Sequence, residues 1–318
     1  MPAASVMTVD TPIRPAGLAR AASPSSLQIP DKARRSRSDS LVAIVRDVWR
    51  SRELVGQFVL RDISIRYTQA FFGFAWALFM PVLIVCSGLM FRLVISTLSG
   101  QPVGSDNVAS LAVKSLPWAF FSGAISVSAQ SIIAYSGLIG KVYFPREALP
   151  LSAVIAQLFD FCLGAVALLV ALILLGLPFT ANALWCIPLV VLFLMFTTGA
   201  ALLLSCANLF FRDVKYIVQV VLNFGVFATP IFFEPHMLGS RGAAIMMALP
   251  LSPFIEGLNI SIVKGHSLLS TVVQATPKGD VLSWSPWYLA YAVVSAVVTL
   301  VIGAKVFRRY SSKFAEMS

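Results

Sequence analysis

The chain has 318 residues, of which 58% are hydrophobic and only 12% are charged, and its mean hydropathy is +0.84. A soluble domain carries roughly 25% charged residues, so this composition excludes an ordinary water-soluble fold. Several apolar runs exceed the roughly 18 to 20 residues that cross the hydrocarbon layer of a bilayer. The composition therefore predicts an all-α integral membrane protein.

The formal net charge is +10, and eleven of the 24 Lys and Arg residues precede residue 70, ahead of the first apolar run. Such flanking charges are typical of cytoplasmic segments of membrane proteins. The sequence contains no basic stretch interleaved with aromatic residues, so nucleic acid is not favoured as a partner. The four cysteines lie inside apolar runs, without C-x-x-C spacing and far from both histidines, so we expect neither a disulfide framework nor a metal site.

Residues 1–45 are rich in proline, serine and alanine and contain the basic run KARRSR, without the apolar core of a secretory signal. They are predicted to be a disordered basic cytoplasmic extension, followed by a membrane domain at 46–318. Within 41–67, apolar residues recur at spacings of three and four, and we assign Arg52, Asp62 and Arg66 to the opposite face. The apolar stripe is too interrupted to span, so it predicts an amphipathic helix at the membrane interface.

Six transmembrane helices are predicted, at 71–98, 116–138, 150–177, 184–209, 217–233 and 286–307, of which the fifth is barely long enough. Arg92 lies about 30 Å along the first span, where its side chain can snorkel to the far interface. An apolar stretch at 243–263 contains Pro250, Pro253 and Glu256. These residues argue against a seventh crossing and favour a re-entrant pair of short helices between spans five and six.

The distribution of basic residues predicts the topology. With six crossings, the N-terminal region, the loops at 139–149 and 210–216 and the C-terminal tail share one side, and nineteen of the 24 basic residues lie there. The positive-inside rule assigns this side, with both termini, to the cytoplasm. The five other basic residues are Arg92, Lys114, Arg241, Lys264 and Lys278.

No enzymatic motif is visible. The chain contains no G-x-x-x-x-G-K-[ST] phosphate loop, no H-E-x-x-H and no G-x-S-x-G. We therefore expect no catalytic site and no cofactor in this chain, and any energy from ATP must come from another protein. Asp160 lies about 15 Å into the third predicted span, where a carboxylate is costly and indicates either function or a packing role. No ionic partner for Asp160 follows from the sequence.

Four stretches carry a resemblance: RDISIRYTQAFFGFAWALFMP at 61–81, LIGKVYFPREALPLSAVIAQLFDF at 138–161, FFRDVKYIVQVVLNFGVFATPIFF at 210–233 and LPLSPFIEGLN at 249–259. In this order they resemble the membrane subunit of ABC-2 type polysaccharide exporters. The resemblance runs from about residue 50 to the end. Ser252 departs from it, because the family commonly has asparagine before this proline, and the departure bears on the detail of the extracytoplasmic gate.

The resemblance implies a homodimer bound to a separate ABC ATPase, which would hold ATP and Mg²⁺. Coupling to the ATPase is implied for Lys141, Tyr143, Phe144, Pro145 and Arg146. A cytoplasmic gate is implied at Arg61, Arg66 and Tyr67, and an extracytoplasmic gate at Pro250, Pro253 and Glu256. Trp76, Phe120 and Phe121 would anchor in the bilayer or stack on sugars, and together with Asp160 they are candidates for channel lining or packing.

The function that this resemblance implies is export of a lipid-linked polysaccharide, such as O-antigen, across the bacterial inner membrane. Capsule, teichoic acid or a hydrophobic small molecule are alternative substrates. A membrane enzyme that acts on lipid-linked sugars is an alternative of another class, although the catalytic constellation is missing. A neighbouring gene for an ATPase would favour the transporter over the enzyme.

Overall fold

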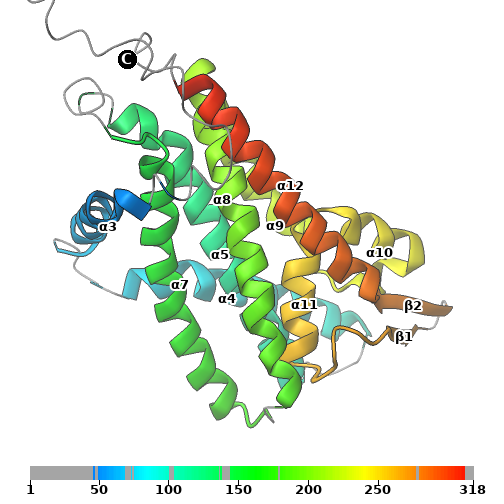
Figure 1. Ribbon diagram of the computed structural model, residues 1–318. Helices are drawn as coiled ribbons and strands as arrows, with labels where there is room; N and C mark the ends of the chain where they lie inside the picture. The colour runs from blue at the N-terminus through cyan, green and yellow to red at the C-terminus, as the bar shows by residue number, and fades with distance from the viewer. Residues whose placement is uncertain are drawn as a thin grey trace, which may run out of the picture. The chain divides into compact units, whose positions relative to one another are not determined.

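The computed structural model describes residues 46, 49–68, 73, 75–99, 104–135, 137, 144–177, 180–276 and 279–311. All of these residues belong to one unit, 39–318, and the predicted extension at 1–45 lies outside the described residues. Helices make up most of the described chain, together with a single two-stranded sheet (Figure 1). The prediction of an all-α membrane protein is confirmed.

Within the described ranges, five helices are long and apolar enough to cross a membrane. The shortest have 25 residues, which corresponds to a rise of about 37 Å against a hydrocarbon layer of about 30 Å. They match the first four predicted spans and the sixth. They are α4 (Ala75–Ser99), α5 (Ser105–Ala134), α7 (Ala148–Leu174), α8 (Cys186–Phe210), which follows the short 3-10 helix η2 (Ala181–Trp185), and α12 (Pro286–Ser311).

Helix α5 begins earlier than expected. The predicted second span starts at residue 116, whereas the helix starts at Ser105 and has 30 residues. A loop was predicted before this span from Gly100, Pro102, Gly104 and Asp106. In the structure the ammonium group of Lys114 is paired with Glu256, so the helix continues through the lysine without leaving a buried charge unpaired.

The predicted fifth span is shorter than expected. It corresponds to α9 (Val214–Ala228), whose 15 residues rise about 22 Å. The helix ends because Thr229 is extended, with ψ of 160°, immediately before Pro230. A residue that precedes proline is disfavoured in the helical region, so α9 stops five residues before the predicted end at 233.

The predicted pair of short helices is present. Helix α10 (Gly239–Ala248) follows the 3-10 helix η3 (Pro235–Leu238), and α11 (Ser252–Ile262) leaves α10 at an angle of 115°. Leu249 is extended before Pro250, and Pro253 lies in the first turn of α11, where its missing N–H leaves no bond unmade. The prolines therefore break this apolar stretch at the expected position.

A β-hairpin between α11 and α12 was not predicted. Strand β1 (Val272–Thr276) pairs in antiparallel register with β2 (Gly279–Trp284), so that Val273 lies opposite Leu282. Gly279 has φ of +115°, which only glycine adopts readily. Trp284 is fully buried, and its indole N–H donates to the carbonyl of Leu268 at 2.9 Å.

Helix α3 (Arg52–Tyr67) differs from the predicted amphipathic pattern, in which apolar and charged residues lie on opposite faces. Val55 and Phe58 are buried as expected, but Asp62 and Arg66 also contact the bundle, through Tyr135 and Asp160. The assignment of Asp62 and Arg66 to the opposite face was wrong, because steps of three and four residues from Phe58 return to the same side of a helix. Apolar side chains also lie outside: Leu60 is 66% exposed and Ile65 68%.

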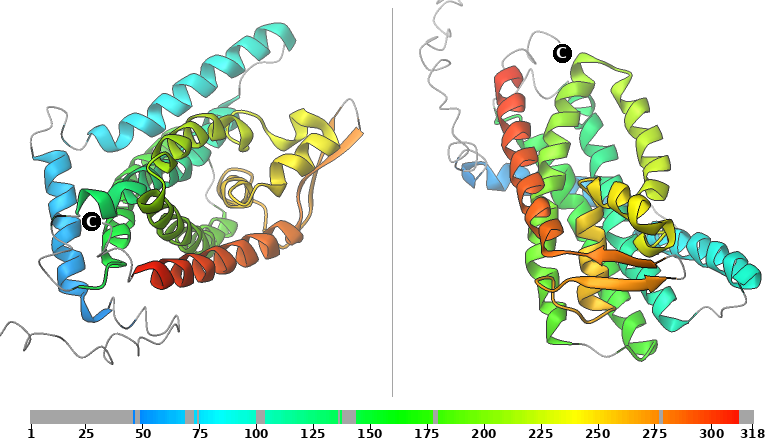
Figure 2. Two further views of the ribbon diagram at one scale, coloured as in Figure 1. Left: turned by 90° about the horizontal axis from the view of Figure 1, so that it is seen from above. Right: turned by 90° about the vertical axis from the view of Figure 1, so that its right-hand side faces the viewer.

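Four of the five long helices follow one another in the order α12, α8, α5 and α4, and α7 packs against α5 and α8 (Figure 2). The α8–α12 contact is close enough that a Cβ built on Gly303 would lie 2.3 Å from the carbonyl oxygen of Gly199. Small residues permit such an approach between membrane helices. One hydrophobic cluster fills the middle of the bundle and the α11 end, and a second joins α3, the start of α7 and the ends of α8 and α12.

Candidate functional site

A polar cluster joins the end of α3 to the middle of α7. The Arg66 guanidinium forms an ion pair with the Asp160 carboxylate and donates to the Gln157 side-chain oxygen at 3.1 Å. The Tyr67 hydroxyl donates to the other Asp160 oxygen, and the Gln157 amide donates to Asp160 at 3.0 Å. Asp160 is buried, whereas Arg66 is partly exposed. The negative charge of Asp160 is compensated by one cation, Arg66, and by two neutral donors.

The structure thus brings together residues that were predicted separately. Arg66 and Tyr67 were candidates for the cytoplasmic gate and Asp160 for the channel or packing, and the three are in direct contact. The sequence did not reveal this pair because the two partners are 94 residues apart. The incorrect face assignment of Arg66 also concealed it.

The polar cluster borders a cavity of about 790 Å³, here called the inner cavity. The cavity is walled by the end of α3 and by α4, α5, α7 and α9. Its volume lies in the range of small-molecule sites, and its lining combines two kinds of chemistry. Apolar side chains include Met80, Leu83, Ile84 and Phe227, and polar ones include Arg66, Gln157, Asp160, Gln219 and Asn223.

The predicted aromatic residues lie mainly in packing contacts. The Phe120 ring is buried and lies 5.3 Å from Phe161 and 5.7 Å from Phe193, although Phe120 also borders the inner cavity. Phe121 stacks on Phe196 at 6.0 Å. The side chain of Trp76 lies outside what the structure describes. Edge-to-face and offset ring pairs of this kind stabilise a helix interface.

The loop before α7 is anchored to α3. Lys141 and Tyr143 lie outside the described residues. Phe144 is buried with its ring 5.7 Å from that of Phe58 on α3, and Pro145 is also buried. Arg146 is partly exposed and donates to the carbonyl of Ser311 at the end of α12. Phe144 therefore connects this loop to α3, and Arg146 connects it to α12.

Arg61 contacts the end of α5 and does not join the Asp160 cluster. Its guanidinium lies 4.4 Å above the centre of the Tyr135 ring, a cation–π arrangement. The Tyr135 hydroxyl in turn donates to Asp62. Helix α3 is thus held at one point by α5 and at another by α7.

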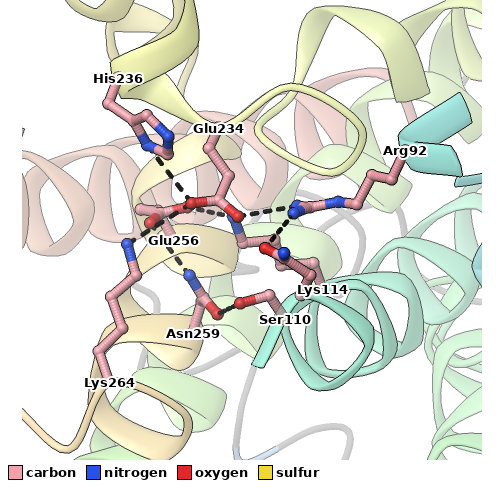
Figure 3. A network of polar contacts seen from close by, with 9 residues as sticks. Arg92, Ser110, Lys114, Glu234, His236, Glu256, Asn259 and Lys264 are labelled. Carbon is pink, nitrogen blue, oxygen red and sulfur yellow. Dashed lines mark hydrogen bonds and ion pairs between the residues drawn. The ribbon is translucent and has the colours of Figure 1, made fainter. Parts of the chain in front are cut away.

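A second polar cluster, separate from the first, surrounds two buried carboxylates (Figure 3). The ammonium group of Lys114 on α5 lies 2.8 Å from the Glu256 carboxylate on α11, and both side chains are 0% exposed. The Arg92 guanidinium on α4 lies 2.8 Å from Glu234, which precedes η3. We call these four residues the ion layer. They join four separate segments of the chain.

Further polar residues surround the four residues of the ion layer. Lys264 and His236 approach the second Glu234 oxygen at 3.7 and 3.4 Å. The Asn259 amide donates to Glu256 at 3.2 Å, and the Ser110 hydroxyl donates to Asn259 at 2.7 Å. Each carboxylate therefore has both a cation and a further polar neighbour, as buried charges require.

Two predictions about this region need revision or qualification. Arg92 does not snorkel to an interface, because Glu234 and the Asn107 side chain hold it in the interior. The three candidates for the extracytoplasmic gate differ in exposure: Pro250 is exposed at the bend between α10 and α11, whereas Pro253 and Glu256 are buried.

Glu234 is charged at neutral pH. Burial alone would raise its pKa, but the positive charges of Lys114, Lys264 and Arg92 outweigh the effect of burial and lower the pKa to about 2. The carboxylate therefore remains an ionic partner for Arg92 over the physiological range. Among the described residues, no group of three or more His, Cys, Asp or Glu side chains is placed to hold a metal ion.

The structure is a helical bundle with a cavity whose wall is partly polar and partly apolar. A comparison of the sequence with known protein families agrees with a membrane transporter. The family model described as ABC-2 type transporter matches residues 53–263. This match covers more than half of the chain. The chain belongs to the ABC-2 type transporter family.

Named relatives of this ABC-2 chain match it over most of its length. An O-antigen export system permease protein, RfbA, of Myxococcus xanthus is 29% identical over 280 residues, which cover 87% of this chain and 99% of the relative. An RfbA protein of Klebsiella pneumoniae is 25% identical over 260 residues, which cover 81% of this chain and 92% of the relative.

The matched range of the ABC-2 family runs from α3 to the end of α11 and contains both polar clusters except Lys264. Arg92, Lys114 and Glu234 were missed as functional candidates. The available signal was their charge inside or beside apolar runs, which we interpreted as snorkelling or loop placement. Five basic residues were assigned to the same side, and three of them, Arg92, Lys114 and Lys264, meet in this cluster.

Proposed function

We propose that this chain is the permease subunit of an ABC exporter that moves a lipid-linked polysaccharide of the O-antigen type across the bacterial inner membrane. A separate ATPase supplies the energy. The observation that carries the proposal is the match to O-antigen export permeases along 92–99% of their length. A match to one segment alone would support only a shared fold, whereas these matches cover 81–87% of this chain.

The inner cavity supports this class of substrate. A lipid-linked glycan has an apolar chain, a charged head and a hydroxyl-rich polymer. The α4 wall of the cavity is apolar, at Met80 and Leu83, whereas the Arg66–Asp160 ion pair makes another part of the wall polar. Gln219 and Asn223 on α9 offer amide groups that can exchange hydrogen bonds with hydroxyls. These features fit an amphipathic substrate better than a purely hydrophobic one.

The energy is proposed to arrive at the loop before α7. In this account the ATPase contacts residues 141–146, with both chain termini on the same cytoplasmic side. Phe144 packs on Phe58 of α3, and the same helix ends in Arg66, which pairs with Asp160 beside the inner cavity. A displacement of the loop can therefore reach the cavity through α3. This path is a contiguous set of contacts between residues that differ widely in sequence position.

A second copy of the chain would complete the conduit. Few residues of α4 are buried in the single chain, and Met80, Met90 and Val94 are more than half exposed. The inner cavity also has α4 and α9 in its wall. A homodimer formed along this face would close the cavity into a shared path and leave the remaining apolar surface to lipid.

Deletion of the gene in its host tests the proposed function. We expect the deleted strain to lose the long polysaccharide bands of its lipopolysaccharide on a gel while the core bands remain. A plasmid copy of the full chain should restore them. Unchanged long bands in the deletion strain would contradict the assignment.

Capsule, teichoic acid and small hydrophobic molecules remain alternative cargoes of the same transporter class. The polar lining of the inner cavity, with Gln157, Gln219 and Asn223, argues against a wholly apolar cargo. Loss of capsule with intact lipopolysaccharide in the deletion strain would favour the first alternative.

A further inference from the structure

The structure contains a second cavity beyond the ion layer. This outer cavity has a volume of about 640 Å³ and a mainly polar wall. It is bordered by the first residues of α5, by Glu234 and His236, by residues 263–266 and by β1. In the proposed topology it lies on the extracytoplasmic side, because these segments are at the opposite end of the bundle from the loop before α7 (Figure 1).

The same order of features occurs along two segments of the chain. On α5, residues 116–127 line the inner cavity, Lys114 belongs to the ion layer, and Asp106, Asn107 and Ser110 line the outer cavity. From the end of α9 onward, Phe227 and Phe232 line the inner cavity, Glu234 belongs to the ion layer, and Glu234 and His236 line the outer cavity.

Helix α4 agrees with this order at its inner side. Its lining residues end at Ser87, and Arg92 follows just over one turn later. The ion layer therefore lies between the two cavities.

We propose that the ion layer is the closed extracytoplasmic gate of the transporter, and that Arg92–Glu234 and Lys114–Glu256 are its positioning residues. This inference rests on the proposed function and refines it, since the gate is formed by paired charges from four segments. Separation of α4 and α5 from Glu234 and α11 must break both ion pairs. In a dry interior that separation is costly.

The charges also give the gate a second stable state. If the conduit opens and water enters, each separated charge regains hydration, and the cost of breaking the pairs falls. The layer then has a paired, dry arrangement and a separated, wet one. Packed interfaces with two such arrangements are a common basis for conformational switching.

The test uses cysteine reporters in the full transporter with its ATPase, in membrane vesicles without ATP. Ser126→Cys reports on the inner cavity, and Val273→Cys, at an exposed position, reports on the outer cavity. A membrane-impermeant, positively charged methanethiosulfonate reagent is added from the extracytoplasmic side. The native cysteines are first replaced by serine; they are Cys86, Cys162, Cys186 and Cys206.

We expect the resting transporter to react rapidly at position 273 and slowly at position 126. Paired neutralisation, Lys114→Gln with Glu256→Gln, removes both charges and leaves no unpaired one. It should accelerate labelling at 126 about tenfold, as a minor open state rises from roughly 1% to roughly 10% of the population. Labelling at 273 should not change. Arg92→Gln with Glu234→Gln provides an independent second variant.

The matched control is Arg241→Gln, because Arg241 is an exposed basic residue on the same side. It should leave both labelling rates unchanged. All variants must co-purify with the ATPase as a single species, which separates a folding defect from an open gate.

An unchanged rate at position 126 in both folded variants would overturn the gate. Equal rates at 126 and 273 in the resting transporter would also overturn it, since the layer would then not separate the cavities. The labelling result does not depend on the cargo. Accelerated labelling in a strain whose lipopolysaccharide does not need this chain would support the gate and reject the proposed substrate.

Discussion

Arg66 and Asp160 come from helices far apart in the sequence, yet their side chains form an ion pair beside the inner cavity. Tyr67 and Gln157 supply further donors to the same carboxylate. Because Arg66 is partly exposed, water can hydrate its positive charge in part when Asp160 is removed. Asp160 is buried and depends on its partners more strongly.

Asp160→Asn should therefore reduce export and lower the free energy of unfolding by roughly 2 kcal/mol, the size of a hydrogen bond to a charged group. Thermal unfolding of the purified transporter and the lipopolysaccharide band pattern measure the two effects. Gln130→Ala, at an exposed residue whose amide bonds only to its own helix, is the control. Wild-type export and stability in Asp160→Asn would remove any role for the charge.

Lys114 and Glu256 are the most deeply buried ion pair among the described residues. Lys114→Met alone leaves the Glu256 carboxylate without its cation, and we expect a loss of roughly 3 to 5 kcal/mol in stability. Lys114→Met combined with Glu256→Leu should be much less destabilising, since no unpaired charge remains. Thermal unfolding in detergent compares the two. Equal losses in both would show that packing, and not charge, dominates at this site.

At the scale of elements, the contacts that hold α3 against the bundle include Phe144 on Phe58, Arg61 on Tyr135, and Arg66 with Asp160. The first of these joins α3 to the loop that we propose contacts the ATPase. Arg146 joins the same loop to the end of α12. The loop is thus attached on two sides.

Phe144→Ala with Arg146→Ala should weaken co-purification of the ATPase and abolish export, while the chain still inserts in the membrane. Removal of the Phe144 ring frees the loop from α3, and loss of the Arg146 guanidinium frees it from Ser311. Phe211→Ala is the control, because Phe211 is 71% exposed at the end of α8. Undiminished co-purification and export in the double variant would refute the coupling role.

The long apolar helices could be predicted from hydropathy because their length alone distinguishes them. The bend at Pro250 and Pro253 was also predictable from local chemistry. The start of α5 was not, since Lys114 is compatible with a buried helix only when Glu256 neutralises it. The hairpin at β1 and β2 was not predicted; β2 begins at Gly279, whose φ of +115° suits glycine.

The candidate site was predictable only in part. Glu256 and Asp160 were identified as carboxylates in apolar surroundings, but their partners, Lys114 and Arg66, lie more than 90 residues away. A single sequence contains no local pattern that joins residues across such distances. Tertiary packing determines these pairs.

At the scale of the whole molecule, the distribution of basic residues predicted the topology, and the structure shows what surrounds the smaller set. Of the five basic residues assigned to the extracytoplasmic side, Arg92 and Lys114 are buried in ion pairs, and Lys264 is partly exposed beside Glu234. Arg241 is exposed, and Lys278 lies outside the described residues. The positive-inside rule counts Lys and Arg residues whether or not they are paired, so the predicted orientation still rests on nineteen basic residues against five.

Labelling from each side tests this topology. A cysteine at the exposed position 309, near the end of α12, should react only with a reagent added from the cytoplasmic side. A cysteine at position 241 should react only from the other side. Reaction of position 309 from outside intact cells would reverse the proposed orientation.

The central claim is that this chain, with an ATPase, carries a lipid-linked polysaccharide across a membrane. The most direct measurement is transport into sealed proteoliposomes that contain the purified permease and its ATPase, with lipid-linked polysaccharide from the host supplied outside. Our account predicts that ATP makes the polysaccharide inaccessible to an added glycosidase, and that the Lys114→Gln and Glu256→Gln pair alters this protection. Equal digestion with and without ATP, by a complex that hydrolyses ATP normally, would contradict it.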